Sequence, residues 1–529
     1  MAFMRRHWAF LLILAGTAVV RLVILFVAQT HVTSDEAIEG LMAKHILEGR
    51  AFPFYFYGTS YNASCAWEAY LAVIPFAIAG VGVVALKLPI VLLSLVCLAL
   101  FYVVAMRLYS IRIATWAALI YALWPSLAKW HYQPRGYAFY FLFIPLLIIL
   151  FLIVEKSESR RALDYFLFGL ACGIALWSME LLLITITGLW FLLLVRRRFS
   201  FSTFAVALGG FFLGYAPAIL WNLTHSMRNW HFLFFEKPES GDFVTRFGLQ
   251  AWCEIFLSEM PKFFSADTVL WYYAETKWAG YILYIASAIA LIVAASKALR
   301  WKSIREGFGS GFTTNEATRD LLMLILVGVS FVPYLIAPLR VPGYFLAAVF
   351  FMSTLLARCI TDWLAQKNMQ KRAAAVALLF AVIGCGVAGI IETTRNEIET
   401  LTFSANRHDQ EMMRVPGADI DAVKKDLADN GHGAVWTTMS FVYPLIFETN
   451  EKLVASESIF GIDRPVYPPS IPKAEPSEHD RSVFVVETKS PFKQQIEETL
   501  ALKSDTPPRI RQHGTLTVIE QRFPVDPPG

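Results

Sequence analysis

Two adjacent carboxylates, Asp35 and Glu36, follow a run of about twenty mostly apolar N-terminal residues. We therefore expect them where the first membrane-spanning helix leaves the lipid. A carboxylate in such a poorly solvated position can be tuned to act as a base. The same residues also suit a helix start, because acids favour the helix N-terminus and Thr33-x-x-Glu36 resembles a capping box. The pattern by itself leaves both roles open.

Two arginines could supply positive charge at the same side of a membrane. Arg135 and Arg340 each lie in a short turn between apolar runs, and Lys129 and His131 precede Arg135 in its turn. A guanidinium group binds phosphate oxygens in a bidentate manner, so these residues are candidates for a phosphate site. The alternative is that the long side chains reach to the membrane interface without binding a ligand.

Aromatic residues follow the carboxylates closely. Tyr57 and Tyr61 lie in an aromatic stretch that could form a platform for a sugar or a lipid, or an interfacial aromatic belt. Trp67 and Glu68 start the next apolar segment and are candidates for contact with an acceptor. Glu68 could also serve only as a helix cap.

Carboxylates, arginines and a membrane surface together suit one reaction. A sugar linked to a lipid phosphate has a good leaving group at the interface. A carboxylate can deprotonate an acceptor hydroxyl while cationic groups stabilise the departing phosphate. Attack from the face opposite the phosphate would invert the anomeric centre. The sequence therefore predicts an inverting sugar transferase, with Asp35 and Glu36 as the catalytic residues.

The composition places these residues on a polytopic membrane protein. Of the 529 residues, 56% are hydrophobic and only 17% are charged, and apolar runs of membrane-spanning length recur. The net charge of +4 is small, and no basic patch interleaved with aromatic residues indicates a nucleic-acid partner. The six cysteines are scattered, without the spacing of a metal site or a disulfide framework.

About eleven apolar runs are expected to cross the membrane as helices. They lie near residues 8–28, 86–106, 113–128, 137–154, 162–177, 181–195, 202–222, 279–296, 320–338, 342–358 and 374–391. If residues 67–84 form a juxtamembrane helix that does not cross, every cytoplasmic segment carries basic residues, as the positive-inside rule requires. This solution predicts a cytoplasmic N-terminus and outer loops at 29–85 and 223–278.

A change of composition near residue 392 predicts a domain boundary. Residues 1–391 are the predicted catalytic membrane domain, and residues 392–529 are polar and predict a small extracytoplasmic α/β domain. In that domain we expect helices over 418–429 and 492–502 and strands over 434–438, 452–456, 483–487 and 515–520. It contains no nucleophile elbow, P-loop or metal spacing, so the chemistry is assigned to the membrane domain.

The chain resembles the GT-C membrane glycosyltransferases, in particular the group of protein O-mannosyltransferases and the lipid A aminoarabinose transferase. The resembling segments, in order, are Ser34–Ala37, Ala43–Gly49, Phe56–Gly58, Trp67–Leu71, Leu86–Pro89, Arg135–Tyr137, and Arg340 with Tyr344. Two features depart from that group: Asn62–Ala66 replaces a Lys-Pro-Pro-like element, and Arg135 lies where some members carry a second acidic residue.

The resemblance implies an active site in the first outer loop, with Asp35 as general base. It also implies a polyprenyl-phosphate-linked sugar donor. The candidates for holding its phosphate are Arg135 and Arg340, with Tyr344 from the resembling segments and Lys129 and His131 as additional charged or polar groups. The acceptor class, whether lipid, glycan or protein, stays open. No cofactor is expected; the resemblance favours a metal-independent reaction and leaves a divalent metal open. The implied location is a bacterial inner membrane, with the active site on the periplasmic side.

Two other functions compete with sugar transfer. A transporter or flippase could use Asp35, Glu36 and Arg21 as a proton or substrate relay, since an arginine inside the first span is costly without a role. Inverted repeats or broken helices would favour transport, and neither is visible in the sequence. The third reading is a membrane protein that binds a lipid-linked sugar without turning it over.

Overall fold

A computed structural model gives the fold of the chain. It describes residues 2–28, 31–57, 65–156, 161–234, 248–265, 275–336, 342–399, 402–405, 412–457, 482–503 and 506–521. Two of the predicted site residues, Tyr61 and Arg340, lie outside the described residues.

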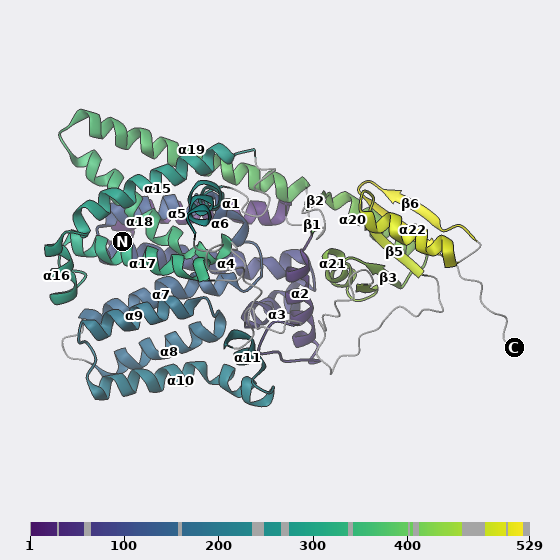
Figure 1. The fold of residues 1–529 in the computed structure, drawn as a ribbon, viewed down its shortest axis with the longest axis horizontal. Coiled ribbons are helices and arrows are strands. Elements are labelled where there is room, and N and C mark those ends of the chain that lie inside the picture. Colours follow the sequence, from purple (N-terminus) through teal and green to yellow (C-terminus); the bar gives the residue numbers. More distant parts are fainter. Residues whose placement is uncertain are drawn as a thin grey trace. The chain divides into compact units, whose positions relative to one another are not determined.

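The described part of the chain is mainly helical (Figure 1). The helices of its first half are α1 (Ala2–Ala28), α2 (Ser34–Leu47), α3 (Trp67–Ala79), α4 (Val83–Leu108), α5 (Ile111–Ala122), α6 (Pro125–Trp130), α7 (Tyr137–Lys156), α8 (Ala162–Ser178), α9 (Leu182–Val195), α10 (Phe201–Thr224) and α11 (Arg228–Phe234). Those that follow are α13 (Leu249–Glu254), the π-helix η1 (Ile255–Glu259), α14 (Met260–Phe263), α15 (Lys277–Ala298), α16 (Trp301–Gly309), α17 (Glu316–Ile336), the 3-10 helix η3 (Pro342–Phe345), α18 (Ala347–Ala365) and α19 (Met369–Glu399).

Strands occur only towards the C-terminus within the described residues. The elements there are β1 (Thr402–Ala405), β2 (Met412–Val415), α20 (Gly417–Asp429), β3 (Ala434–Thr437), α21 (Met439–Glu448), β4 (Val454–Glu457), β5 (Ser482–Glu487), α22 (Pro491–Lys503), β6 (Arg509–His513) and β7 (Leu516–Gln521). β1 and β2 form an antiparallel pair. The others form a five-stranded sheet of order β4-β3-β5-β7-β6, in which β3 is parallel to β4 and β5, and β7 is antiparallel to β5 and β6.

Eight helices among the described residues are long and apolar enough to cross a membrane. Their spans are Met4–Val27, Val83–Leu108, Tyr137–Lys156, Phe201–Thr224, Lys277–Ala298, Glu316–Leu335, Ala347–Ala365 and Met369–Asn396. The shorter apolar helices α5, α8 and α9 coincide with the three other predicted spans. The predicted fold class, a polytopic helical membrane protein with a small C-terminal α/β part, is confirmed.

The segment predicted not to cross forms a short helix of its own. α3 has 13 residues, and Gly80 follows its last residue with a positive φ of 86°, which suits glycine. It is one of the shorter apolar helices rather than one of the eight long spans. Its helical structure is therefore as predicted, while its position at the outer leaflet stays a prediction.

The chain forms two compact units, each built from segments that are separate in sequence. Unit 1 contains residues 1–22, 60–65 and 90–393; unit 2 contains residues 23–59, 66–89 and 394–529. Unit 2 therefore combines the predicted first outer loop with the C-terminal α/β part. The domain division predicted at residue 392 falls at one of these junctions, and the function assigned to each predicted domain stays a prediction.

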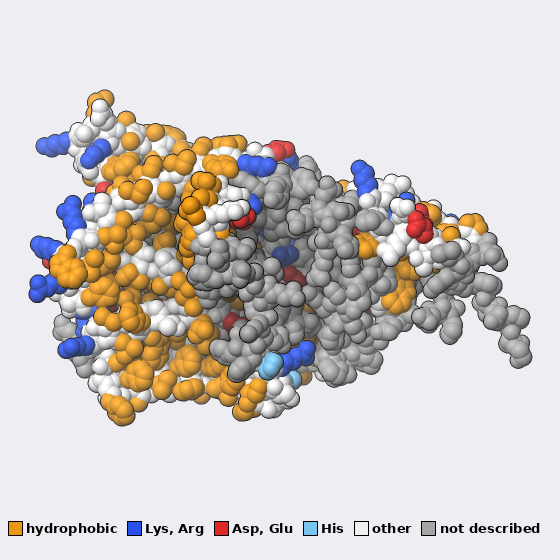
Figure 2. All heavy atoms as spheres, in the orientation of Figure 1, with side chains coloured by type: hydrophobic (Ala, Val, Ile, Leu, Met, Phe, Trp, Pro, Cys, Tyr) orange, Lys and Arg blue, Asp and Glu red, His pale blue; other side chains and the backbone are white. Residues whose placement is uncertain are grey.

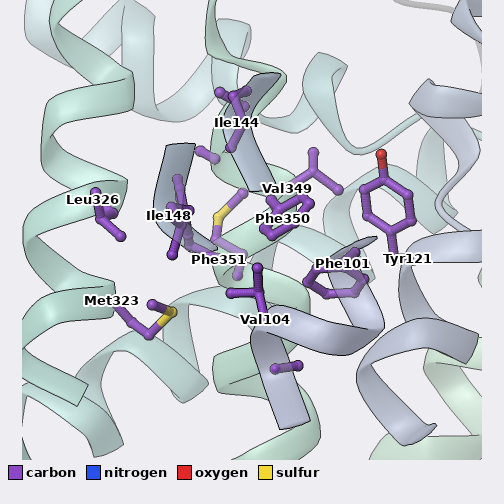
Figure 3. Packing of buried hydrophobic residues seen from close by; sticks show 14 of the residues in the cluster. Phe101, Val104, Tyr121, Ile144, Ile148, Met323, Leu326, Val349, Phe350 and Phe351 are labelled. Carbon is purple, nitrogen blue, oxygen red and sulfur yellow. The ribbon is translucent and has the colours of Figure 1, made fainter. Parts of the chain in front are cut away.

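Unit 1 is a helical bundle around one large apolar core (Figure 3). α8 and α10 pack closely because glycines remove the side chains between them: a Cβ atom on Gly169 or Gly173 would meet backbone atoms of α10. Gly210 and Gly214 make the reciprocal approach from α10. These two Gly-x-x-x-Gly pairs are the packing device typical of membrane helices.

The surface of unit 1 suits a lipid environment. Hydrophobic side chains cover the long helices, and Lys and Arg side chains gather at the end of the bundle where α16 lies (Figure 2). That end includes the exposed residues Arg300, Lys302 and Arg305, all of which belong to a segment predicted to be cytoplasmic. The distribution is the one that the positive-inside rule describes.

In unit 2 the helix that carries the predicted catalytic residues is buried on all sides. Every side chain of α2 from Glu36 to Ile46 is buried, and α3 and α21 pack against it. Gly40 permits this packing, because a Cβ atom there would lie 2.4 Å from the ring of Phe447 in α21. The apolar side chains of α2 therefore pack within the protein, and the side chains on the opposite side of this helix are buried as well.

Candidate active site

The N-terminus of α2 has the cap that the sequence predicts. The backbone amide of Thr33 donates to Glu36 Oε2 at 2.7 Å, and the Thr33 hydroxyl donates to the same oxygen at 2.9 Å. This is the reciprocal bond of a capping box, so Glu36 caps α2, while its catalytic role stays a prediction. Asp35, in the first turn, is only partly buried.

Glu36 also forms a buried ion pair. Its Oε1 lies 3.1 Å from Nζ of Lys87 at the start of α4, and the two side chains are 1% and 2% exposed. Both ionised groups are removed from water, and each compensates the desolvation cost of the other. Glu36 is therefore already engaged at both oxygens, by Lys87 and by the cap. This arrangement suits a residue that positions the start of α2.

Two further carboxylates belong to the same group. Glu68, at the start of α3, is buried, and Glu39 is fully buried one helical turn after Asp35. Neither oxygen of Glu39 has a hydrogen-bond partner of good geometry among the described residues. Glu39 was not among the site residues predicted from the sequence. The signal was the spacing Asp35-x-x-x-Glu39, which places both side chains on one face of a helix.

Burial raises the pKa of Glu39 well above its usual value, and the neighbouring carboxylates of Glu68 and Asp35 raise it further. A contact with the backbone of Ala69 lowers the pKa but does not compensate. Burial and the neighbouring acids therefore favour the protonated form of Glu39. With Glu36 paired to Lys87 and Glu39 neutral, Asp35 is the partly accessible carboxylate at the beginning of α2.

This protonation predicts a pH-dependent stability that Glu39→Gln removes. A carboxyl whose pKa is raised by folding stabilises the protein below its unfolded pKa, and this contribution is lost as the pH rises through the folded value. We expect Glu39→Gln, which imitates the neutral acid, to lose less stability than the wild type as the pH rises above the pKa of an unfolded glutamate. Thermal unfolding in detergent at rising pH measures the effect. Glu498→Gln, at an exposed position of α22, is the control and should follow the wild type. Parallel curves for Glu39→Gln and wild type would show that Glu39 is ionised.

Tyr57 and Trp67, predicted to contact substrate, belong to unit 2 with the carboxylates. Tyr57 is buried, and its hydroxyl lies 3.4 Å from Nδ1 of His45. Burial raises the pKa of Tyr57, so its hydroxyl stays protonated. Trp67 is partly buried and directly precedes Glu68 in α3. Their contact with substrate stays a prediction, as does that of Tyr61, which lies outside the described residues.

A second ionic cluster fixes the C-terminal end of α2. Glu451, just after α21, accepts hydrogen bonds from Lys44 Nζ at 2.6 Å and Arg50 Nη1 at 2.9 Å, and its Oε1 lies 3.1 Å from Nε2 of His45. Burial by itself would raise the pKa of Glu451, but the bonds to His45 and Lys44 outweigh it and lower the pKa to about 2. Asn450 and Glu451 adopt positive φ angles of 55° and 61°, so the backbone turns sharply to present this carboxylate.

The predicted phosphate-binding residues within the described part of the chain belong to unit 1. Lys129 is buried in the last turn of α6, His131 is buried just after that helix, and Arg135 is partly buried before α7. Tyr344 is partly buried in η3. Their convergence with α2 stays a prediction, and Arg340 lies outside the described residues.

Glu180, in the turn between α8 and α9, is a further buried acid. It accepts a hydrogen bond from Nδ2 of Asn229 at 2.9 Å, and burial raises its pKa to about 7. Among the described residues, no group of three or more His, Cys, Asp and Glu side chains has an arrangement that could hold a metal ion. The metal-independent reaction favoured above stays a prediction.

No family model and no curated protein matches the sequence. Among solved structures the chain is similar to ArnT from Cupriavidus metallidurans, in the apo state and bound to undecaprenyl phosphate. The identities are 11% and 12%, the TM-score is 0.61 for both, and the likeness covers 98% of this chain and 99% of ArnT. The apo oligosaccharyltransferase of Archaeoglobus fulgidus is similar at 11% identity and a TM-score of 0.52, over 87% of this chain and 66% of that protein. Both proteins are members of the GT-C superfamily. The chain therefore has the fold of the GT-C membrane glycosyltransferases.

Proposed function

We propose that this protein is an inverting glycosyltransferase that moves a sugar from a polyprenyl-phosphate donor to an acceptor hydroxyl at the extracytoplasmic membrane face. The observation that carries the proposal is the carboxylate group at the beginning of α2. Lys87 compensates the charge of Glu36, burial favours the neutral form of Glu39, and Glu68 is buried, so we assign the partly accessible Asp35 as the base. The fold supports the proposal, and ArnT, a structure with the same fold, binds undecaprenyl phosphate.

In this mechanism Asp35 accepts the proton of the acceptor hydroxyl as its oxygen attacks the anomeric carbon. The bond from that carbon to the phosphate oxygen breaks, and its electron pair stays on the phosphate. A new glycosidic bond forms with inverted configuration, and polyprenyl phosphate leaves. Positive charge at the phosphate stabilises the leaving group, which is the role proposed for Arg135 and Arg340.

Glu36 and Glu39 act on Asp35 rather than on the substrate. The Glu36–Lys87 pair fixes the first turn of α2, and a protonated Glu39 adds no negative charge beside Asp35. If both were free carboxylates, three like charges would repel one another in the first turns of α2. The arrangement thus favours one ionised base.

The experiment that tests the function is a transfer assay. Purified protein is incubated with polyprenyl-phosphate-linked sugars and with lipid, glycan or peptide acceptors, and the release of polyprenyl phosphate is measured. We expect release that depends on both donor and acceptor. Donor binding without release in any combination would favour a binding protein, and movement of the intact donor across a bilayer would favour a flippase.

The predicted phosphate site gives a separate test. Since a charge-assisted hydrogen bond contributes about 1.5–3 kcal/mol, Arg135→Ala and Arg340→Ala should each weaken donor binding by roughly 10–100-fold. Titration of the donor into purified protein measures this. Arg228→Ala is the matched control, because Arg228 is exposed at the start of α11 in another predicted outer loop. Unaltered donor affinity in both variants would refute the phosphate role.

A further inference from the structure

Three buried polar side chains from separate segments meet within unit 1. Arg21 lies on α1, Tyr121 near the end of α5, and His131 in the turn after α6; they are 4%, 1% and 2% exposed. The rings of Tyr121 and His131 lie 6.1 Å apart between centroids. Burial lowers the pKa of His131 well below its usual value, and the nearby charge of Arg21 lowers it further. His131 is therefore neutral, with one ring nitrogen able to donate and the other to accept.

These side chains carry unused hydrogen-bonding capacity. Arg21 Nη1 donates to the hydroxyl of Ser94, but Arg21 Nη2 has no partner among the described residues. Both ring nitrogens of His131 and the hydroxyl of Tyr121 also have none in that part of the chain. A buried polar group without a partner costs about 1–3 kcal/mol. Several such groups in one place indicate a ligand that pairs with them.

The charge of Arg21 is the strongest indication. Two other buried arginines of unit 1 have carboxylate partners: Arg358 pairs with Asp320, and Arg196 Nη2 lies 3.5 Å from Glu155 Oε1. Arg21 forms no such pair with any described residue. A guanidinium group inside a membrane span is costly unless an anion compensates it. We therefore expect a bound anion to supply the negative charge that balances Arg21.

The packing of Tyr121 and the position of Arg21 along α1 set the placement of these hydrogen-bond donors. The ring of Tyr121 packs 4.8 Å from that of Phe101 in the apolar core, and its hydroxyl points away from Phe101 and Val104 (Figure 3). Arg21 lies six residues before the end of the span Met4–Val27, which is about 9 Å along the helix. Donors from three segments suit the several oxygens of a phosphate group better than a single-atom anion.

We propose that Arg21, Tyr121 and His131 bind one phosphate group within unit 1. Arg21 supplies the positive charge, and the tyrosine hydroxyl and the neutral imidazole supply further hydrogen bonds. The phosphate belongs to a lipid headgroup or to free phosphate, which share this chemistry. The proposal does not depend on sugar transfer, because it concerns binding alone.

The test measures binding of three probes to the purified full-length protein: undecaprenyl phosphate, phosphatidylglycerol and inorganic phosphate. The loss of one charge-assisted contact should weaken the binding of at least one probe by roughly 10–100-fold in Arg21→Gln. Arg305→Gln, at an exposed position of α16, is the matched control and should bind as the wild type does. Because the proposed donor site can also bind undecaprenyl phosphate, the site is read from the probes whose binding Arg21→Gln weakens. Weaker binding of undecaprenyl phosphate alone would identify a carrier site, of both lipids a general lipid-phosphate site, and of all three a site for the phosphate group itself.

Tyr121→Phe separates binding from folding. Removing a hydroxyl that lacks a partner should leave the thermal stability of the ligand-free protein unchanged or higher, because no bond is lost. The same change should weaken phosphate binding by roughly 3–10-fold, the effect of one neutral hydrogen bond. The proposal is overturned if no probe binds, or if Arg21→Gln and Tyr121→Phe bind every probe as the wild type does.

Discussion

Asp35→Asn is expected to reduce turnover by about 10²–10⁴-fold, the usual contribution of a general base. Asparagine keeps the shape of the side chain but cannot accept the proton of the acceptor hydroxyl. Because Asp35 is only partly buried and Glu36 makes the cap, the variant should fold and bind the donor as the wild type does. The measurement is the initial rate of polyprenyl phosphate release at saturating donor.

Two controls make this result specific. Asp429→Asn removes an exposed acid from α20, in the same unit, and should not change the rate. Donor titration and thermal unfolding of Asp35→Asn show whether the loss is chemical. Equal turnover in Asp35→Asn and wild type would remove Asp35 from the mechanism, whereas a loss of donor affinity with an unchanged maximal rate would assign it to binding.

Lys87→Met is expected to destabilise the protein by about 3–5 kcal/mol, because it leaves Glu36 buried and ionised without its partner. Unfolding in mixed detergent, monitored by circular dichroism, measures the change in free energy. Activity should fall along with stability, since α2 begins at this pair.

A double-mutant cycle isolates the pair itself. Glu36→Gln combined with Lys87→Met removes both charges, so the double variant should be more stable than the sum of the single changes predicts, by roughly 0.5–3 kcal/mol. Lys302→Met is the surface control. Its pair with Glu306 is exposed, at 3.9 Å, and should contribute at most about 1 kcal/mol. Additive effects at Glu36 and Lys87 would mean that the pair is not coupled.

Local patterns in the sequence were sufficient to predict many of the elements. The spans coincide with helices because long apolar runs have few alternatives in a membrane. In the C-terminal part, the apolar spacing of Ile420, Val423 and Leu427 predicted α20, and the strands β3, β4, β5 and β7 lie where they were expected. β1, β2, α21 and β6 were missed, because none of these short segments shows a clear period.

Such local patterns do not predict contacts between segments that are distant in the sequence. Lys44, near the end of α2, is buried and bonded to Glu451, 407 residues later in the chain, and no spacing in the sequence predicts this contact. The Lys87 partner of Glu36 was likewise not predicted from the spacing of either residue. Of the site, the capping role of Glu36 was predictable, because it depends on Thr33 three residues before. Glu39 was predictable by its helical spacing and was overlooked.

The division of unit 2 between both ends of the polypeptide has a consequence for biosynthesis. A ribosome delivers α2 to the membrane long before it has made residues 394–529, so Lys44 and His45 emerge when Glu451 does not yet exist. Until the last segment arrives, the newly made helix lacks the surface of α21 that later encloses it. A transcript truncated after residue 393 would thus yield a chain in which α2 lacks the surface of α21 that packs against it.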